Sequence, residues 1–492
     1  MKLFKDIKGI TGIRESFKTR QVKYGGYAAL MTLAVITGLF LVNLIAGRFS
    51  FQVDMTDTKI FSLSEQSVQV LETVNTPVRF YALWRPGETM PLPNGRDYME
   101  DVMTVISLYT SRNSNITVEM VDPDRNAGFA RRYDRDNKGI ARGSLIVEGE
   151  GGFRVIAPTD MYDISQTQSG GVNITGVAVE RRITSALLSA GTGLAPVVYE
   201  ITGYDTIPLA DVRMQDELTW ENYTLKSVNL LLSAAPSDAS ALILHSPGRD
   251  LGEGEVQKLL DYLESGGRLL VMADYNIREL ANLNVLLASY GLRFDFGIVH
   301  ETDASAYIDI GNLRLKIPEL SPHDINTPLL DNTKTPLLIP TAMPLSILET
   351  RRRTIEITPL MTSSPAAFLR TNLDLSSQAV TASDIPGPHI LAAAVTDPSW
   401  VQGDEPQARL VVIGSAALLQ LGVKFNQDFF LNSLAWLQDR PETISLRSKS
   451  LFLLPLRLNA LQVVVFGGFF IFIIPLAFFV SGFVTWLKRR HL

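Results

Sequence analysis

Two long stretches without a formal charge frame this 492-residue chain. The first covers residues 24–47 and the second covers residues 458–487. Because an α-helix rises about 1.5 Å per residue, either stretch is long enough to cross a hydrocarbon core of roughly 30 Å. We therefore predict two membrane-spanning helices, one in each stretch. The alternatives are a cleavable signal peptide for the first, which its length and the poor Ala-x-Ala match at Leu44-Ile45-Ala46 disfavour, and a buried core helix for the second.

The charges are distributed unevenly along the chain. The formal net charge is −6, but residues 1–23 carry +5 and residues 488–492 carry +3, which leaves −14 for residues 48–457. Basic residues beside membrane helices favour the cytoplasmic side. This asymmetry predicts a protein of the bacterial inner membrane, with both termini cytoplasmic and residues 48–457 on the extracytoplasmic, periplasmic side. The negative charge of that region also disfavours nucleic acid as a partner.

The residue types that carry thiol and metal chemistry are scarce. Cysteine is absent, and the closest two of the five histidines, His300 and His323, are 23 positions apart. Thiol catalysis, disulfides, cysteine–zinc sites and a local His-x₃-His metal pair are therefore excluded. We predict no catalytic residue, no cofactor and no metal. The sequence also lacks a Gly-x-x-x-x-Gly-Lys-[Ser/Thr] motif, so ATP hydrolysis and a pore would have to come from other subunits.

The pattern over residues 48–194 predicts a first extracytoplasmic α/β domain. Apolar runs that stop at turn residues indicate strands, and apolar residues at helical spacing indicate helices. The expected helices are 65–74, 97–110 and 127–134, and the expected strands are 78–84, 116–122, 144–149 and 153–157. This order of strand, helix, strand, helix and hairpin resembles a thioredoxin-like fold without its dithiol. A polar loop at 163–176 and a helix near 177–190 then lead to the next domain.

Residues 195–457 predict a second extracytoplasmic α/β domain. The expected strands are 195–203, 240–246, 268–274 and 409–414, and the expected helices are 252–267, 280–292, 426–437 and one that carries Leu225, Val228, Leu231 and Leu232. Such alternation favours a mostly parallel sheet with helices on both faces, similar to flavodoxin-like and glutamine-amidotransferase-like domains. Residues 301–400 are less regular and rich in proline, so we expect an insertion or a small β-rich subdomain there.

A weak candidate ligand cleft follows from this predicted sheet. Open α/β sheets bind ligands beyond the carboxyl ends of their strands. The residues that follow the predicted strands are Gly203, Tyr204, Asp205, Ser246, Asp274 and Gly414. Ser246 and Ser415 are the serines that could indicate a hydrolase, but neither lies in a Gly-x-Ser-x-Gly motif.

Four segments together resemble one protein family. They are DMTDTKIFSLSEQSVQVLE from residue 54, ALILHSPGRDLGEGEVQKLLDYLESGGRLLVMAD from residue 241, RLVVIGSAALLQ with NQDFFLNSLAWL, and the late VTWLKRR. In this order they resemble the GldG family of auxiliary components of ABC-type systems, first associated with gliding motility. The turn at Thr202–Thr206 departs from that family, because its usual His and Glu are missing.

The resemblance implies a non-enzymatic auxiliary subunit that assembles with an ABC-2-type permease and a cytoplasmic ABC ATPase. The expected partners also include membrane lipid and further subunits in a homo- or hetero-oligomer. A gliding role does not follow from it. Two other functions stay open: an envelope scaffold without transport, and a membrane-anchored hydrolase.

The first of the four segments is the candidate for coupling to the permease. Its signature falls on Asp54, Thr56, Lys59, Leu63 and Ser64. The segment joins the first uncharged stretch to the first predicted domain, so permease motion could reach the domain through it. The alternative is that Asp54, Thr56 and Ser64 only cap a helix.

Overall fold

The computed structural model describes most of the chain between Ser62 and Arg440, together with parts of both ends. The described residues are 27, 30–41, 62–93, 95–134, 137–166, 172–192, 195–275, 279–310, 313–330, 336–371, 380–398, 407–440, 449–450 and 467–490. The chain divides into two compact units, Met1–Phe61 and Ser62–Leu492.

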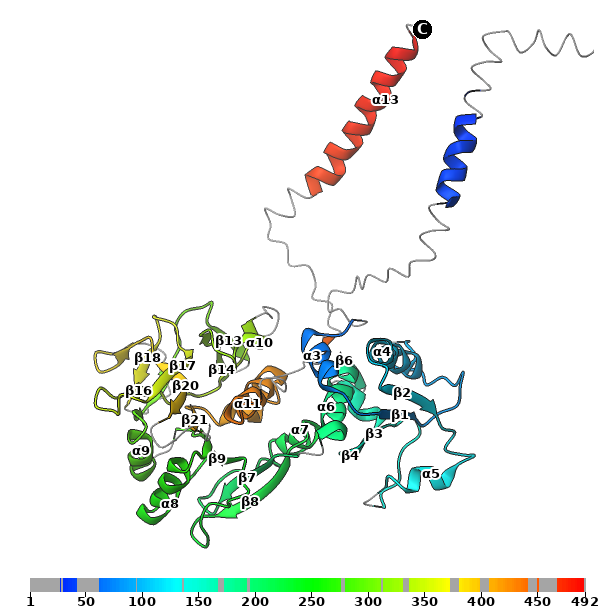
Figure 1. Ribbon diagram of the computed structural model, residues 1–492. Helices are drawn as coiled ribbons and strands as arrows, with labels where there is room; N and C mark the ends of the chain where they lie inside the picture. The colour runs from blue at the N-terminus through cyan, green and yellow to red at the C-terminus, as the bar shows by residue number, and fades with distance from the viewer. Residues whose placement is uncertain are drawn as a thin grey trace, which may run out of the picture. The chain divides into compact units, whose positions relative to one another are not determined.

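The prediction of two flanking membrane helices is wrong. In the first stretch the structure describes Tyr27 and residues 30–41, and these residues are helical. In the second, a π-helical segment Phe469–Ile473 precedes the α-helix α13, Ile474–Arg490 (Figure 1). Within the described ranges, no helix is both long and apolar enough to cross a membrane. The predicted topology, with both termini in the cytoplasm, is not confirmed.

The first α/β domain is built on a four-stranded sheet. Its elements in chain order are α3 (Glu65–Thr73), β1 (Val78–Ala82), α4 (Tyr98–Arg112), β2 (Ile116–Met120), α5 (Ala127–Arg131), β3 (Leu145–Gly149) and β4 (Gly152–Ile156). The strand order is β2-β1-β3-β4, with β1 parallel to β2 and the other pairs antiparallel. The expected order of strand, helix, strand, helix and hairpin is therefore present, and the thioredoxin-like assignment stays a prediction. The helix α6 (Val179–Thr192) packs on β3, β4 and α3.

The segment expected to be a polar loop at 163–176 contains a β-hairpin instead. Strands β5 (Tyr162–Gln166) and β6 (Val172–Val177) pair antiparallel, with a register shift at Asp163/Ile164. A third strand, β22 (Lys449–Ser450), pairs with β6 from far along the chain. The polar composition hid the hairpin, because its pairing depends on backbone hydrogen bonds and a distant strand rather than on an apolar alternation.

The second domain contains a ten-stranded mixed sheet, which corrects the expected mostly parallel one. Five strands are parallel: β8 (Thr224–Asn229), β7 (Val197–Thr202), β9 (Ala241–His245), β10 (Arg268–Met272) and β21 (Ala408–Ile413). The antiparallel part contains β20 (Ile390–Asp397), β16 (Leu345–Ile347), β11 (Leu292–Phe294), β17 (Glu356–Thr362) and β15 (Glu319–Leu320). Residues 301–400 thus supply strands of the main sheet, because β20 pairs directly with β21.

One predicted helix of this domain is a strand. Leu225 and Val228 have helical spacing, but they lie in β8, which pairs in parallel with β7 along its whole length. Leu231 and Leu232 lie beyond the strand and are exposed. The helix in this part of the chain is α7 (Met214–Trp220), which comes before β8. Pairing with β7 has overridden the local pattern, as tertiary context often does for short segments.

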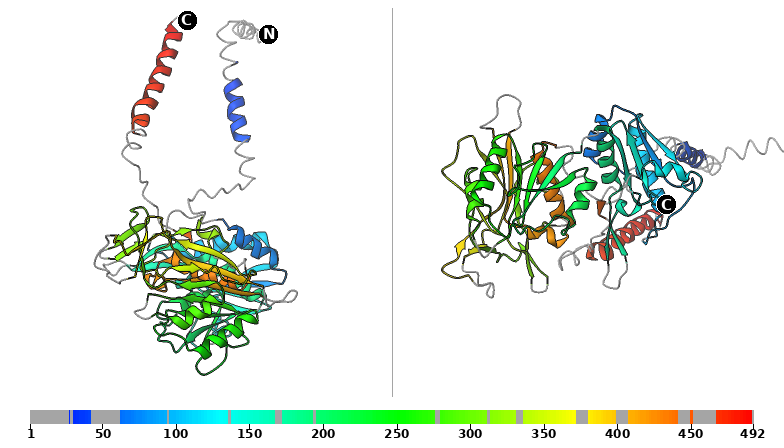
Figure 2. Two further views of the ribbon diagram at one scale, coloured as in Figure 1. Left: turned by 90° about the vertical axis from the view of Figure 1, so that its left-hand side faces the viewer. Right: turned by 90° about the horizontal axis from the view of Figure 1, so that it is seen from below.

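Apolar layers cover both faces of the larger sheet. Along β10, Leu270 and Met272 face one core cluster, whereas Leu269 and Val271 face the other, as the alternation of a strand requires. The first cluster includes side chains of α7 and α11 (Lys424–Leu437), and the second includes side chains of α8 (Glu253–Glu264) and α9 (Ala281–Ala288). Figure 2 shows the sheet with these helices from two further directions. Burial on both faces explains the continuous apolar runs of the central strands.

The 3₁₀ helix η1 (Pro158–Met161) contacts α6 and β5. The remaining elements of the second domain are β12 (Ile298–His300), β13 (Tyr307–Ile310), β14 (Leu313–Lys316), α10 (Thr327–Leu330), β18 (Phe368–Arg370), β19 (Ile385–Pro386) and η2 (Ala417–Leu421).

Candidate functional site

The predicted coupling segment is described only at its end. Asp54, Thr56 and Lys59 lie outside the described residues. Ser64 is the N-cap of α3, and its hydroxyl accepts a hydrogen bond from the Ser67 backbone nitrogen at 3.2 Å. Leu63 precedes it and is half-buried. Ser64 therefore has the capping geometry of the simpler alternative, and a coupling role for the segment stays a prediction.

Ser64 also makes long-range contacts with Glu180, in the first turn of α6. The Ser64 backbone nitrogen and hydroxyl donate to Glu180 Oε1 at 2.6 and 2.8 Å, and the Ser67 hydroxyl donates to the same oxygen at 2.6 Å. Glu180 is buried, with 5% of its surface exposed. Hydrogen bonds to a carboxylate are charge-assisted and strong. The three bonds to Glu180 therefore fix the start of α3 against α6.

Two further side chains extend this polar cluster. The Ser67 and Thr184 hydroxyls are 3.0 Å apart, and the Tyr109 and Thr184 hydroxyls are 2.5 Å apart. The Tyr109 hydroxyl also lies within 3.1 Å of the Glu180 carbonyl oxygen, to which it can donate. Burial raises the pKa of Tyr109, so its hydroxyl stays protonated. The cluster therefore links α3, α4 and α6 by hydrogen bonds inside the first domain.

The next residue of α6, Arg181, contacts the second domain instead. Its guanidinium lies 2.5 Å from Glu221, 3.5 Å from Glu217 and 3.7 Å from Asp428. The Arg181 side chain is 1% exposed. Burial by itself would lower the pKa of Arg181, but the three carboxylates outweigh it and raise that pKa. Arg181 is thus a fixed positive charge that joins α6 to α7 and α11.

Other contacts strengthen this junction between the two α/β domains. Lys424 donates to Glu217 at 2.8 Å. Burial would raise the pKa of Glu217, yet the positive charges of Lys424, Arg181 and Arg182 lower it to about 2. The Arg182 guanidinium stacks over the Trp220 ring at 4.0 Å, and the Ser185 hydroxyl donates to the Trp220 carbonyl at 2.6 Å. The first two turns of α6 therefore bind α7 through both charge and stacking.

Sequence reasoning missed this junction. Its signal in the sequence is the run Glu180-Arg181-Arg182 at the start of a helix that is otherwise apolar or small. Charged residues are rarely fully buried unless they are paired. A triple charge in a helix that must cover a sheet is therefore a signal for buried ion pairs, but the partners are too far away in sequence to be named.

The residues of the predicted cleft do follow strands that end at one edge. Gly203 to Asp205 follow β7, Ser246 follows β9, Asp274 follows β10 and Gly414 follows β21. These strands are parallel neighbours. The Ser246 hydroxyl donates to Asp274 Oδ2 at 3.1 Å, and the Ala417 backbone nitrogen donates to Asp274 Oδ1 at 2.8 Å. Asp274 therefore ties two loops together.

The two glycines of this edge have structural reasons of their own. Gly203 has a φ of +99°, which side-chain-bearing residues rarely adopt. A Cβ at Gly414 would lie 1.8 Å from the Met343 carbonyl oxygen. Both positions are thus explained by backbone packing, without a ligand.

His245 has its δ nitrogen engaged at the same edge. Its Nδ1 lies 2.7 Å from the Ile207 carbonyl, so Nδ1 carries the proton and donates. Burial lowers the pKa of His245, so the ring is neutral. The Nε2 atom and the Ser415 hydroxyl are buried without a partner in the described part of the chain. These contacts do not show whether a ligand binds at this edge, so the ligand cleft stays a prediction.

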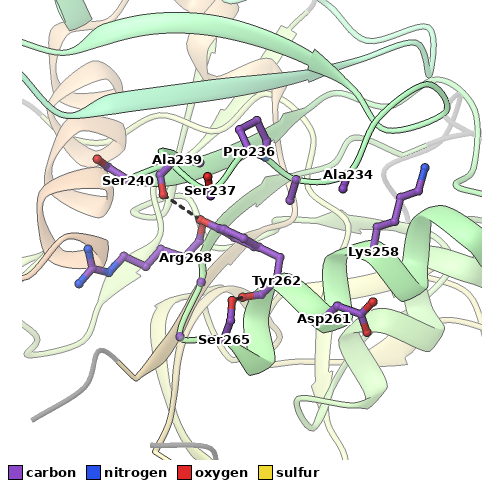
Figure 3. Close-up of a pocket in the computed structure, with 13 residues that line it drawn as sticks. Ala234, Pro236, Ser237, Ala239, Ser240, Lys258, Asp261, Tyr262, Ser265 and Arg268 are labelled. Carbon is purple, nitrogen blue, oxygen red and sulfur yellow. Dashed lines mark hydrogen bonds between the residues drawn. The ribbon is translucent and has the colours of Figure 1, made fainter.

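A cavity of about 510 Å³ lies at the opposite, amino-terminal edge of the parallel strands. Its wall consists of the loop before β9, the end of α8 and the turn before β10 (Figure 3). The Lys258 and Arg268 side chains extend in opposite directions, and the Tyr262 hydroxyl donates to the Arg268 carbonyl at 3.3 Å. Its charged groups therefore do not converge on one point. Over the described ranges, no group of three or more His, Asp or Glu side chains could hold a metal ion.

Comparison with known families supports a transport-associated class. Residues 196–438 match a family model described as an ABC-type uncharacterized transport system, and residues 57–161 match a domain of unknown function. The first match supports the broad family of auxiliary components of ABC-type transport systems, and hence an auxiliary role in association with an ABC transporter at a membrane. Such a family points away from an enzyme. The narrower resemblance to the GldG family is not confirmed, and a search of curated proteins found no match.

The similar solved structures are distant. The mmIFT52 N-terminal domain is 14% identical, with a TM-score of 0.35, and the match covers 49% of this chain and 96% of that one. A cytoplasmic protein from Salmonella typhimurium is 12% identical, with a TM-score of 0.28 and coverages of 49% and 98%. A ThuA-like protein from Parabacteroides merdae is 12% identical, with a TM-score of 0.27 and coverages of 48% and 90%. Similarities this weak carry no functional conclusion.

Proposed function

We propose that this chain is a non-enzymatic auxiliary subunit of an ABC-2-type transporter, bound to a multispan permease and a cytoplasmic ABC ATPase. The observation that carries the proposal is the match of residues 196–438 to the transport family. That range covers the second α/β domain from β7 to the end of α11. We further place residues 48–457 on the periplasmic side of the bacterial inner membrane, in keeping with their net charge of −14 and the absence of cysteine.

Within this function we favour coupling of permease motion to the second domain over direct substrate binding. The coupling segment ends at Ser64, which is bonded to Glu180 of α6. The next residue of α6, Arg181, is bonded to the second domain. The 510 Å³ cavity has no convergent polar groups that would define a substrate.

A hydrolase at the sheet edge has less support. The Ser246 hydroxyl donates a hydrogen bond to Asp274, and His245 Nδ1–H donates a hydrogen bond to the Ile207 carbonyl oxygen. A serine nucleophile needs a base that accepts its proton and a third group that orients that base. The contacts of Ser246 and Asp274 instead hold the loops after β9, β10 and β21 together.

Affinity purification tests the proposed function. A C-terminal tag on the full chain is used in mild detergent, and the co-purifying proteins are identified by mass spectrometry. We expect an ABC ATPase and a multispan permease in amounts comparable to the tagged chain. Recovery of the chain alone, or with envelope proteins only, would contradict the proposal. A catalytic-glutamate variant of the recovered ATPase then separates transport from scaffolding, because a scaffold would keep its cellular phenotype in that background.

A further inference from the structure

We infer that the first turn of α6 is a two-sided joint that transmits displacement of the Ser64 segment to the second domain. This inference deepens the proposed function and rests on it for its biological use. Its structural content, a linkage between α3 and α7 through two adjacent residues, stands on the contacts alone.

The first side of the joint is Glu180. Its Oε1 receives hydrogen bonds from two donors of Ser64 and one of Ser67, which are 116 and 113 positions away in sequence. Because Ser64 is also the N-cap of α3, a shift of the chain before Ser64 pulls on the cap and on Glu180 together. Hydrogen bonds of 2.6 to 2.8 Å on a buried carboxylate tolerate little extension.

The second side is Arg181, one residue further along the same helix. Its partners Glu217 and Glu221 belong to α7 and the residue after it, and Asp428 belongs to α11. The interaction between buried charges is strong, because little water screens it, so a given change in distance changes its energy more than it would at the surface. A small rotation of this turn therefore changes the contacts of α7 and α11 with α6.

The turn itself is stiff enough to act as one body. Glu180 and Arg181 share the backbone hydrogen-bond ladder of α6, and Arg182 donates from its backbone to the Ala178 carbonyl at 2.9 Å. The neighbouring Arg182 side chain also donates to the Asp160 carbonyl at 3.1 Å. Consecutive helix residues point about 100° apart, so neighbours can contact different domains. Contiguous packed contacts of this kind can carry coupling, but the coupling itself has to be measured.

Amide hydrogen exchange on the purified full chain measures the coupling between α3 and α7. The test variants are Ser67→Ala, which removes one donor to Glu180, and Glu180→Gln, which removes its charge. The described hydrogen bonds of the Ser67 side chain are to Ser64, Tyr109, Glu180 and Thr184, all in the first domain or in α6. The matched control is Glu72→Gln, the same chemical change at an exposed position of α3.

We expect amide exchange in α3 and also in α7 to become about threefold faster or more in Ser67→Ala, because local opening of α7 then costs less. Glu180→Gln should act in the same direction, and Glu72→Gln should leave both helices unchanged. Faster exchange in α3 alone would overturn the inference, as would an equal response to the control variant. If Glu180→Gln does not fold, Ser67→Ala decides the question.

This outcome is separable from that of the proposed function. If the wild-type chain recovers no permease, the transport role fails whatever the exchange data show. If the permease is recovered but amide exchange in α7 is unchanged in Ser67→Ala, the transport role stands and the inferred linkage through α6 is wrong.

Discussion

Glu180 and Arg181 are consecutive residues of one helix, yet their side chains bind different domains. Glu180 accepts three hydrogen bonds from the start of α3, and Arg181 pairs with three carboxylates of the second domain. Both side chains are buried. A buried ion pair is seldom a net source of stability compared with apolar packing, but breaking one is costly. These contacts therefore fix the position of α6 against α3, α7 and α11 more than they add to the free energy of unfolding.

Replacement of Arg181 tests the charge cluster. Arg181→Met keeps an unbranched, apolar stem but removes the guanidinium, so Glu217, Glu221 and Asp428 lose their shared cation. We expect a loss of about 3–5 kcal/mol in the free energy of unfolding, measured by urea denaturation. The control is the exposed Arg353→Met, which should change the free energy by less than about 0.5 kcal/mol. Similar losses in both variants would show that Arg181 is not specially placed.

The depressed pKa of Glu217 predicts a pH dependence. In the folded chain this pKa is about 2, against 4.5 for the unconstrained group. The ionised form is thus favoured by folding, so its contribution is complete above about pH 4.5 and is lost as the pH falls towards 2. The size of the shift corresponds to roughly 3 kcal/mol. Urea titrations from pH 6 to pH 2 should show a steeper loss in the wild type than in Glu217→Gln, and parallel curves would contradict the assignment.

Asp274 should be a stability residue. Asp274→Ala removes the acceptor for both the Ser246 hydroxyl and the Ala417 backbone nitrogen. We expect a loss of about 1–3 kcal/mol, since two partly buried donors lose their acceptor, and a smaller loss for Ser246→Ala. Thermal unfolding measures both. A hydrolase would instead lose cellular function in Ser246→Ala at unchanged stability, and that result would revive the alternative.

Replacement of two glycines by alanine should change the stability in opposite directions. Gly414→Ala would place a Cβ 1.8 Å from the Met343 carbonyl oxygen, so the β21 end must shift. We expect a loss of about 2 kcal/mol or more, by analogy with other overpacked sites. Gly191 lies in α6 with open space at its Cβ position, so Gly191→Ala should stabilise the chain by about 0.5–1 kcal/mol. Differential scanning calorimetry of both variants checks the pair.

The sequence pattern predicted the central strands of both domains well. Apolar runs such as 240–246 and 268–274 correspond to β9 and β10, because strands covered on both faces are apolar throughout. The pattern failed where partners are distant. The polar hairpin β5–β6 and the edge strand β8 are formed by pairing, which local spacing does not encode. Apolar length alone also predicted two membrane-spanning helices, whereas the described residues contain no helix that is both long and apolar enough to cross a membrane.

The candidate site was predictable only in part. Ser64 was identified as a helix cap or coupling residue, and its capping geometry is present. Glu180 and Arg181 were missed, because their partners lie elsewhere in the chain and no local spacing brings them together. The residues of the predicted cleft follow parallel strands, but their contacts with each other and with Met343 follow from tertiary packing, and the cleft itself stays a prediction.

ATP hydrolysis by the co-purified complex tests the central claim most directly. The complex is reconstituted in nanodiscs with the wild-type chain, with Ser67→Ala and with Glu72→Gln, and recovery of the permease is compared first. If the chain couples to the transporter through Ser64 and α6, Ser67→Ala should change the hydrolysis rate by about twofold or more at equal recovery, and Glu72→Gln should match the wild type. An unchanged rate in Ser67→Ala, with the complex fully assembled, would contradict the account.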